Sequence, residues 1–171
     1  MAGEKFLKHD TAGGFTETVA TQAGGAGNEN KVPALDAAGR LDATMMPTGI
    51  GADTASIVAN GALSAGDFVN IYDNAGTVTC RVADASALGT RAHGFVLSAV
   101  ADAAMATVYF EGENNGAGVS GMVGGDVFLS ETAGKATATA PTTSAAIVQK
   151  LGVAISATGI NVEIGTPVLL A

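Results

Sequence analysis

The sequence has no tryptophan, two tyrosines and one cysteine among its 171 residues. A lone cysteine excludes a disulfide bond within the chain. It lies in the stretch TVTCRV, where alternation places Val78, Cys80 and Val82 on one strand face and predicts a buried thiol. Sugar-binding surfaces usually use Trp or Tyr, so having only Tyr72 and Tyr109 weighs against a carbohydrate-binding module.

Basic residues are also scarce, with eight Lys and Arg against 16 Asp and Glu, which gives a net charge of −8. Nucleic-acid binding depends on clustered Lys and Arg side chains that neutralise phosphates. In this sequence no two basic residues are adjacent, so we expect no nucleic-acid binding. The scattered positions are Lys5, Lys8, Lys31, Arg40, Arg81, Arg91, Lys135 and Lys150.

Long apolar runs are missing as well. The first residues, MAGEKFLKHDTAGGFTETVA, contain no apolar stretch of the kind that a secretory signal needs. No window approaches the roughly 18 consecutive apolar residues that a membrane-spanning helix needs. We therefore expect a protein that is made in the cytoplasm and has no membrane partner.

Small residues are abundant instead. The chain has 34 Ala and 24 Gly, together 58 of 171 residues. Small side chains bury little area each, so the core must come from the Val, Ile, Leu and Phe residues, most of which follow residue 50.

Residues 1–50 are predicted to form an extended N-terminal arm. Large apolar residues are sparse in this part, the stretch TQAGGAGNENK (21–31) is typical of a flexible connector, and Pro33 and Pro47 bracket short apolar pieces. Such a segment cannot form a core of its own, so we expect it to lie on a partner. The candidate contact residues are Phe6, Leu7, Phe15, Val32, Leu35, Leu41, Met45 and Met46.

Residues 51–171 are predicted to form an all-β body, either a barrel or a sandwich. Turn signals recur about every 8–12 residues, and Asp73-Asn74-Ala75-Gly76 joins FVNIY to TVTCRV as a hairpin. Strand alternation is clear in ATVYFE and INVEI, where Ala106, Val108 and Phe110, and likewise Ile160, Val162 and Ile164, share a face. The helical candidates, SAVADAAMA (98–106) and TTSAAIVQKLG (142–152), are short.

A weak internal duplication is also present. GDFVNIYDNAGTV, from Gly66, is similar to GDVFLSETAGKAT, from Gly125. GFVLSAV and ATVYFEG follow the first copy, and GVAISAT and INVEIGT follow the second. Two similar half-units could therefore build the body, although chance similarity in an Ala- and Gly-rich chain is the alternative.

Motifs for catalysis or cofactor binding are weak, and we expect neither an enzyme nor a cofactor. Gly116–Gly121 matches G-x-G-x-x-G, but another strand follows where a dinucleotide site needs a helix. One Cys and two distant His, His9 and His93, are too few for a zinc site. Catalysis by Cys80 with His93, and a carboxylate pair at Glu111 and Glu113, are outweighed by structural interpretations as a buried thiol and as solvated loop charges.

The arm KVPALDAAGRLDATMMPTGIGADT, followed by GALSAGDFVNIYDNAGT, GFVLSAV and ATVYFEGENNG, resembles tailed-bacteriophage virion proteins. The most similar are capsid decoration (cement) proteins and related head-fibre and tail-fibre modules. The resemblance covers nearly the whole chain, but its motifs are turns and strands. It implies a β-rich structural protein on the capsid exterior that binds the major capsid protein, stabilises the shell and self-associates, as a trimer or alternatively a dimer.

Three other hypotheses remain. The first is a head-fibre, tail-fibre or baseplate-attached module, in which the arm would be a stem. The second is a carbohydrate-binding module for a host surface, and the third is an enzyme that depends on His93 or Glu111.

Overall fold

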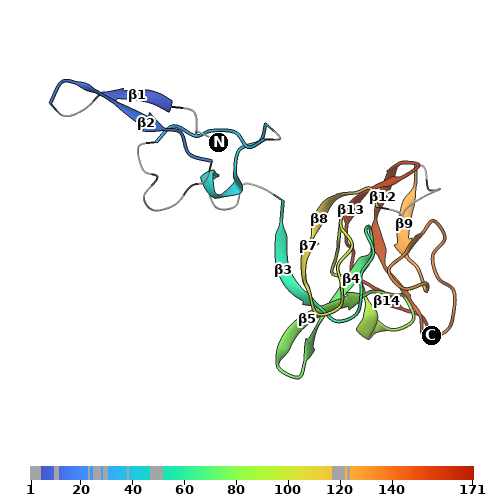
Figure 1. Cartoon of the computed structure of the whole chain (residues 1–171). Helices are drawn as coiled ribbons and strands as arrows, with labels where there is room; N and C mark the ends of the chain where they lie inside the picture. Colours follow the sequence, from blue (N-terminus) through green and yellow to red (C-terminus); the bar gives the residue numbers. More distant parts are fainter. Residues whose placement is uncertain are drawn as a thin grey trace. The chain divides into compact units, whose positions relative to one another are not determined.

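The computed structural model describes residues 5–9, 12–22, 24, 28, 31–37, 39–46, 52–116, 122 and 124–171. The chain divides into two compact units, Met1–Gly51 and Ala52–Ala171, each of which is treated by itself below (Figure 1). In the described residues, regular structure consists of β-strands and short 3-10 turns, without an α-helix. The predicted all-β class is therefore confirmed.

The first unit contains a hairpin of strands β1 (Lys5–His9) and β2 (Phe15–Val19). The strands are antiparallel, with Leu7 opposite Glu17, and Gly13 in the turn has a φ of +87°. A single 3-10 turn, η1 (Ala43–Met45), is described further along. The sparse apolar pattern of this part predicts an extended arm and does not predict the hairpin.

The second unit begins with a closed barrel, whose described strands follow the order β3-β5-β4-β6-β7. Strands β3 and β5 pair in parallel, and all other neighbours are antiparallel. The strands are β3 (Thr54–Ala59), β4 (Phe68–Asn74), β5 (Thr77–Val82), β6 (Gly94–Phe95) and β7 (Met105–Tyr109). Inward side chains of these strands and of the adjoining segments form one core cluster, made of Ile57, Ala59, Leu63, Val69, Cys80, Val96, Ala106 and Val108.

The predicted hairpin between FVNIY and TVTCRV is confirmed as β4–β5. Asn74 pairs with Thr77, which leaves a two-residue loop of Ala75 and Gly76. Both loop residues have positive φ, 51° and 87°, as a type I′ turn requires. This turn matches the right-handed twist of the strands and sets their register.

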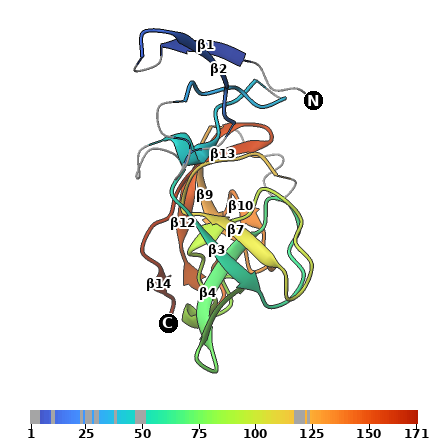
Figure 2. The ribbon, with the colours of Figure 1, turned by 60° about the vertical axis from the view of Figure 1, so that its left-hand side comes forward.

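A five-stranded sheet with the described order β10-β9-β12-β13-β8 packs on the barrel. Phe68 and Phe95 project from the barrel into a core shared with Leu129, Leu151 and Ile160 of the sheet. In Figure 1, β3 and β7 lie on one side of the body and β9 and β12 on the other; in Figure 2 the side with β3 and β7 comes forward. The sheet strands are β8 (Glu111–Asn114), β9 (Asp126–Leu129), β10 (Ala136–Thr137), β12 (Lys150–Ser156) and β13 (Gly159–Glu163).

The remaining elements are short. Strands β11 (Ile147–Val148) and β14 (Val168–Leu169) pair with each other, so the C-terminal segment lies beside β11. The 3-10 turn η2 (Leu88–Thr90) lies in the connection between β5 and β6.

The strand order agrees with the predicted duplication. In the first half, β3-β7-β6-β4-β5 are neighbours in that order, and in the second half β8-β13-β12-β9-β10 repeat it. The register also repeats, since Ala55 pairs with Val108 in the first half and Gly112 pairs with Val162 in the second. The halves differ in closure, because β3 also pairs with β5 whereas β8 and β10 are the two edges of their sheet.

Other local predictions have mixed outcomes. The shared faces in ATVYFE and INVEI are confirmed, with Ala106, Val108, Ile160 and Val162 buried. Cys80 is buried as predicted, but Val78 on the same face is exposed because the hairpin tip extends past the core.

The two short helical candidates form turns and strands instead. In the part of the chain that the structure describes, there is no helix long and apolar enough to cross a membrane.

Candidate interaction surface

One face of the β1–β2 hairpin carries three apolar and three polar side chains. The register places Lys5, Leu7 and His9 on the same side as their opposite residues on β2, which are Val19, Glu17 and Phe15 respectively. The ring of His9 meets the ring of Phe15 edge to face, with 5.4 Å between centroids, and Nζ of Lys5 lies 2.6 Å from the Glu17 carboxylate. These contacts pair four of the six side chains of the face across the two strands.

The apolar side chains of this hairpin face are uncovered in the structure. Leu7 and Phe15 are each 70% exposed, and Val19 is 46% exposed. Contiguous exposed apolar side chains are uncommon on monomeric proteins and often mark a contact surface. Val19 is a member of this face that the predicted contact set omits.

Most of the predicted contact residues are exposed. Phe6 and Met45 are half-buried, and the other six have open side chains. The exposed members are Leu7, Phe15, Val32, Leu35, Leu41 and Met46. Burial of the described large apolar side chains in this unit is therefore low, as expected for a segment without its own core.

Hydrogen bonds hold the backbone conformation of the first unit. Thr21 and Pro33 form a parallel bridge, in which the Thr21 N–H donates to the Val32 carbonyl at 3.0 Å. Nε2 of Gln22 donates to the Leu35 carbonyl at 2.9 Å. Because these bonds use the backbone and amides, they order the chain while Val32 and Leu35 stay exposed.

Asp42 begins the η1 turn. Its carboxylate accepts bonds from the hydroxyl and the backbone N–H of Thr44, and these two bonds lower the pKa of Asp42. Both bonds are accepted by Oδ1, so the carboxylate acts as a local cap of the turn.

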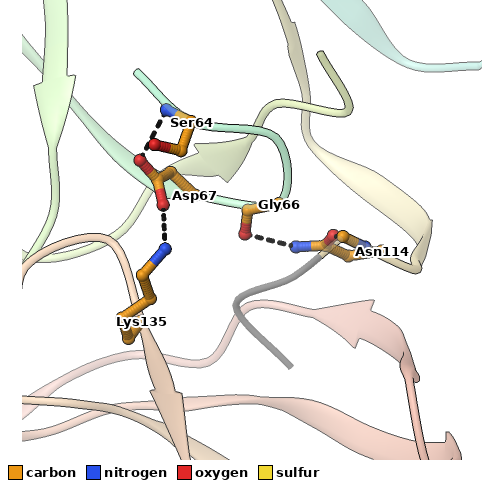
Figure 3. A network of polar contacts seen from close by, with 6 residues as sticks. Ser64, Gly66, Asp67, Asn114 and Lys135 are labelled. Carbon is orange, nitrogen blue, oxygen red and sulfur yellow. Dashed lines mark hydrogen bonds and ion pairs between the residues drawn. The ribbon is translucent and has the colours of Figure 1, made fainter. Parts of the chain in front are cut away.

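Polar residues in the body join its two halves (Figure 3). The buried carboxylate of Asp67 accepts the Ser64 N–H at 2.8 Å and lies 2.6 Å from Nζ of Lys135. Nδ2 of Asn114 donates to the Gly66 carbonyl at 3.0 Å. Both contacts run between the turn before β4 and the second half, so their role is structural.

Gln149 makes a second buried link. Its Oε1 accepts the Ala92 N–H at 2.8 Å, and its Nε2 donates to the carbonyls of Ala92 and Gly165 at 2.9 and 3.1 Å. The side chain replaces the backbone pairing that the irregular segment before β6 lacks. Sequence patterning does not single out this glutamine, because an amide in an apolar stretch has no distinctive spacing.

His93 has a similar positional role. Its Nδ1 accepts the backbone N–H of Ile71 at 2.9 Å, which requires that nitrogen to be unprotonated. Burial and the positive charge of Arg91 lower the pKa of His93. The ring is therefore a neutral acceptor that ties the start of β6 to β4.

These positions do not favour the catalytic hypothesis. Cys80 lies in the barrel core, and burial raises the pKa of its thiol, which opposes formation of the nucleophilic thiolate. His93 directs Nδ1 at Ile71. Within the described ranges, His, Cys, Asp and Glu do not gather into a group able to hold a metal ion.

Two further sequence features are located only in part. Glu111 and Glu113 lie on β8, on one face of the sheet, so they are strand residues where the sequence predicts loop charges. Residues 117–121 of the glycine-rich motif lie outside the described residues.

Comparison with known protein families, with curated proteins and with solved structures finds no match. The candidate surface therefore rests on the geometry of the chain itself.

Proposed function

We propose that this chain is a structural protein of a tailed-bacteriophage particle, which binds the outside of the capsid and stabilises the mature shell. In this proposal the first unit contacts the major capsid protein and bridges neighbouring copies. The observation that carries it is that Leu7, Phe15 and Val19 are placed on one face by the strand register and are uncovered. The motif resemblance supplies the identity of the partner.

The physical basis is binding linkage. A protein that binds only the mature shell lowers the free energy of that state by mass action. Apolar side chains spaced along a short segment can cover a large partner surface. The net charge of −8 favours a position away from packaged DNA, which agrees with the exterior location.

Self-association belongs to the same proposal. Homo-oligomers usually have closed cyclic symmetry, and the resemblance favours a trimer over a dimer.

Particles from a phage that lacks this gene provide the test. The full chain is added to such particles, and co-sedimentation measures its affinity. Replacing Leu7 and Phe15 by Ser should weaken binding by about tenfold or more, because exposed apolar anchors dominate such contacts.

A matched control replaces Val78 and Met105 by Ser, since these are similarly exposed apolar residues on the body. This control should bind as the unaltered chain does. Equal binding by both variants would contradict the role assigned to the hairpin face.

A further inference from the structure

The outer sheet face is the side of the five-stranded sheet turned away from the shared core. The register aligns Glu113, Asn161, Val153 and Asp126 across β8, β13, β12 and β9. Alternation places the residue two positions away on each strand on the same face. These additional residues are Glu111, Glu163, Ile155 and Phe128.

Three carboxylates on this face have no Lys or Arg partner among the described residues. Glu111 lies directly opposite Glu163, and Glu113 lies two residues from Glu111 on the same strand. Lys150 is engaged with Asp126, 2.7 Å away. Among the described residues, no Lys or Arg forms an ion pair with the three glutamates. Like charges directly opposite on paired strands destabilise the pair.

Apolar side chains border these carboxylates. Val153 is 41% exposed and Ile155 is 57% exposed. A Cβ built on Gly159 would lie 3.1 Å from Oε1 of Glu113 and 3.7 Å from Cγ1 of Ile155, so these two side chains are close together. A shallow depression beside them is lined by Ala52, Glu111, Gly112, Asn161, Val162 and Glu163.

The internal repeat shows that the fold does not need these charges. The register of β3 with β7 matches that of β8 with β13. At the positions of the Glu111–Glu163 and Glu113–Asn161 pairs, the first half has Thr54–Tyr109 and Ser56–Thr107. The same backbone arrangement thus forms with uncharged side chains, so the repulsive pair is particular to the second half.

We propose that the outer sheet face is a second contact surface for the shell protein, occupied by a surface that presents Lys or Arg side chains around a small apolar patch. This inference rests on the proposed function and adds a site on the body. Cations from the partner would remove the repulsion between Glu111 and Glu163, and its apolar side chains would cover Val153 and Ile155.

Zero-length cross-linking tests the proposal in intact particles that carry the full chain. A carbodiimide joins a carboxylate to a lysine only where the two are in contact, and mass spectrometry locates the bond. We expect bonds from Glu111, Glu113 or Glu163 to lysines of the shell protein. Asp73 and Glu131, which are exposed carboxylates elsewhere on the body, serve as controls and should give few.

Each result is decisive. Bonds to a second copy of this chain, or bonds spread evenly over the controls, would overturn this inference and leave the proposed function standing. Absence of the chain from the particles would overturn both.

Substitutions guided by the repeat provide a second test. A variant with Glu111→Thr, Glu113→Ser and Glu163→Gln should bind particles about tenfold more weakly or worse. Adding about 300 mM salt should reduce the affinity of this variant less than it reduces the affinity of the unaltered chain. It should also unfold at an equal or higher urea concentration, because a repulsion is removed. If the glutamates had a purely structural role, the variant would not combine weaker binding with equal or higher stability.

The control variant, Asp73→Asn with Glu131→Gln, should keep full affinity. Glu163→Gln alone serves if the triple variant fails to fold, with a smaller loss of affinity expected in the same direction. Unchanged affinity in a folded variant would overturn the inference.

Discussion

Buried polar residues in the body differ in whether their hydrogen bonds are satisfied. Gln149 is buried with both ends of its amide bonded, whereas the buried hydroxyl of Thr79 has no partner among the described residues. Removing a side chain that bonds buried backbone groups leaves those groups without a partner, which destabilises the fold. Removing a buried hydroxyl that has no partner stabilises the fold, because its desolvation is no longer uncompensated.

Two substitutions test this difference. Gln149→Leu should lower the free energy of unfolding by about 2–4 kcal/mol, because Ala92 and Gly165 lose their partner. Thr79→Val should raise it by about 1 kcal/mol, since the shape is kept and the unbonded hydroxyl is removed. Urea unfolding measures both, and a stable Gln149→Leu protein would contradict the assigned role.

The lowered pKa of His93 predicts that the free energy of unfolding depends on pH. Its pKa is lowered in the folded protein, so below the ordinary histidine value of about 6.5 the unfolded chain takes up a proton before the folded one does. The contribution of His93 to stability is therefore complete above about pH 6.5 and is lost as the pH falls through the folded pKa. Unfolding measured between about pH 7.5 and pH 5 should show this decrease.

A suitable variant isolates the histidine. His93→Asn offers an oxygen to the Ile71 N–H without titrating, and it should flatten this part of the pH profile. A decrease that persists in His93→Asn would assign it to other groups.

At the scale of elements, the two halves place an aspartate at equivalent positions with different surroundings. Asp67, before β4, is buried and bonded to both Ser64 and Lys135. Asp126, which begins β9 and follows a glycine as Asp67 does, forms an exposed pair with Lys150. The repeat thus offers an internal comparison of one residue type in two environments.

We expect Asp67→Asn to lower the free energy of unfolding by about 1–2 kcal/mol, because the buried carboxylate is lost while the partly exposed ammonium of Lys135 keeps some solvent. Asp126→Asn should cost less than about 1 kcal/mol, since exposed pairs contribute little. Similar values for the two would show that the Asp67 contact does not connect the halves energetically.

How much of this structure the sequence predicts depends on how local the cause is. Strand alternation in INVEI and the Asp73–Gly76 turn are local patterns, and both are confirmed. Barrel closure by the parallel β3–β5 pair, and the Asp67–Lys135 contact across 68 residues, arise from tertiary packing that no local pattern encodes. The β1–β2 hairpin is also missed, because exposed strands lack the apolar alternation of a buried face.

The candidate surface is predicted only in part for the same reason. Apolar residues that are sparse along residues 1–50 are identified as open to a partner, and six of the eight are exposed. Their role as contacts stays a prediction. The facing pair of Glu111 and Glu163 could not be foreseen, because cross-strand register is needed to bring together residues 52 positions apart.

At the scale of the whole molecule, the body should fold without the first unit. Deleting residues 1–46 removes the hairpin but keeps β3 and both core clusters, which draw on residues after 52. The truncated chain should unfold cooperatively at nearly the same urea concentration as the full chain and should lose most of its affinity for particles. Loss of folding would show that these residues complete the body.

The central claim is that this chain is a component of the capsid exterior. Quantitative mass spectrometry of purified particles, with the chain measured against the major capsid protein, tests this most directly. We expect copy numbers comparable to those of the shell protein. A few copies per particle would instead indicate a fibre or baseplate component, and absence from the particles would contradict the account.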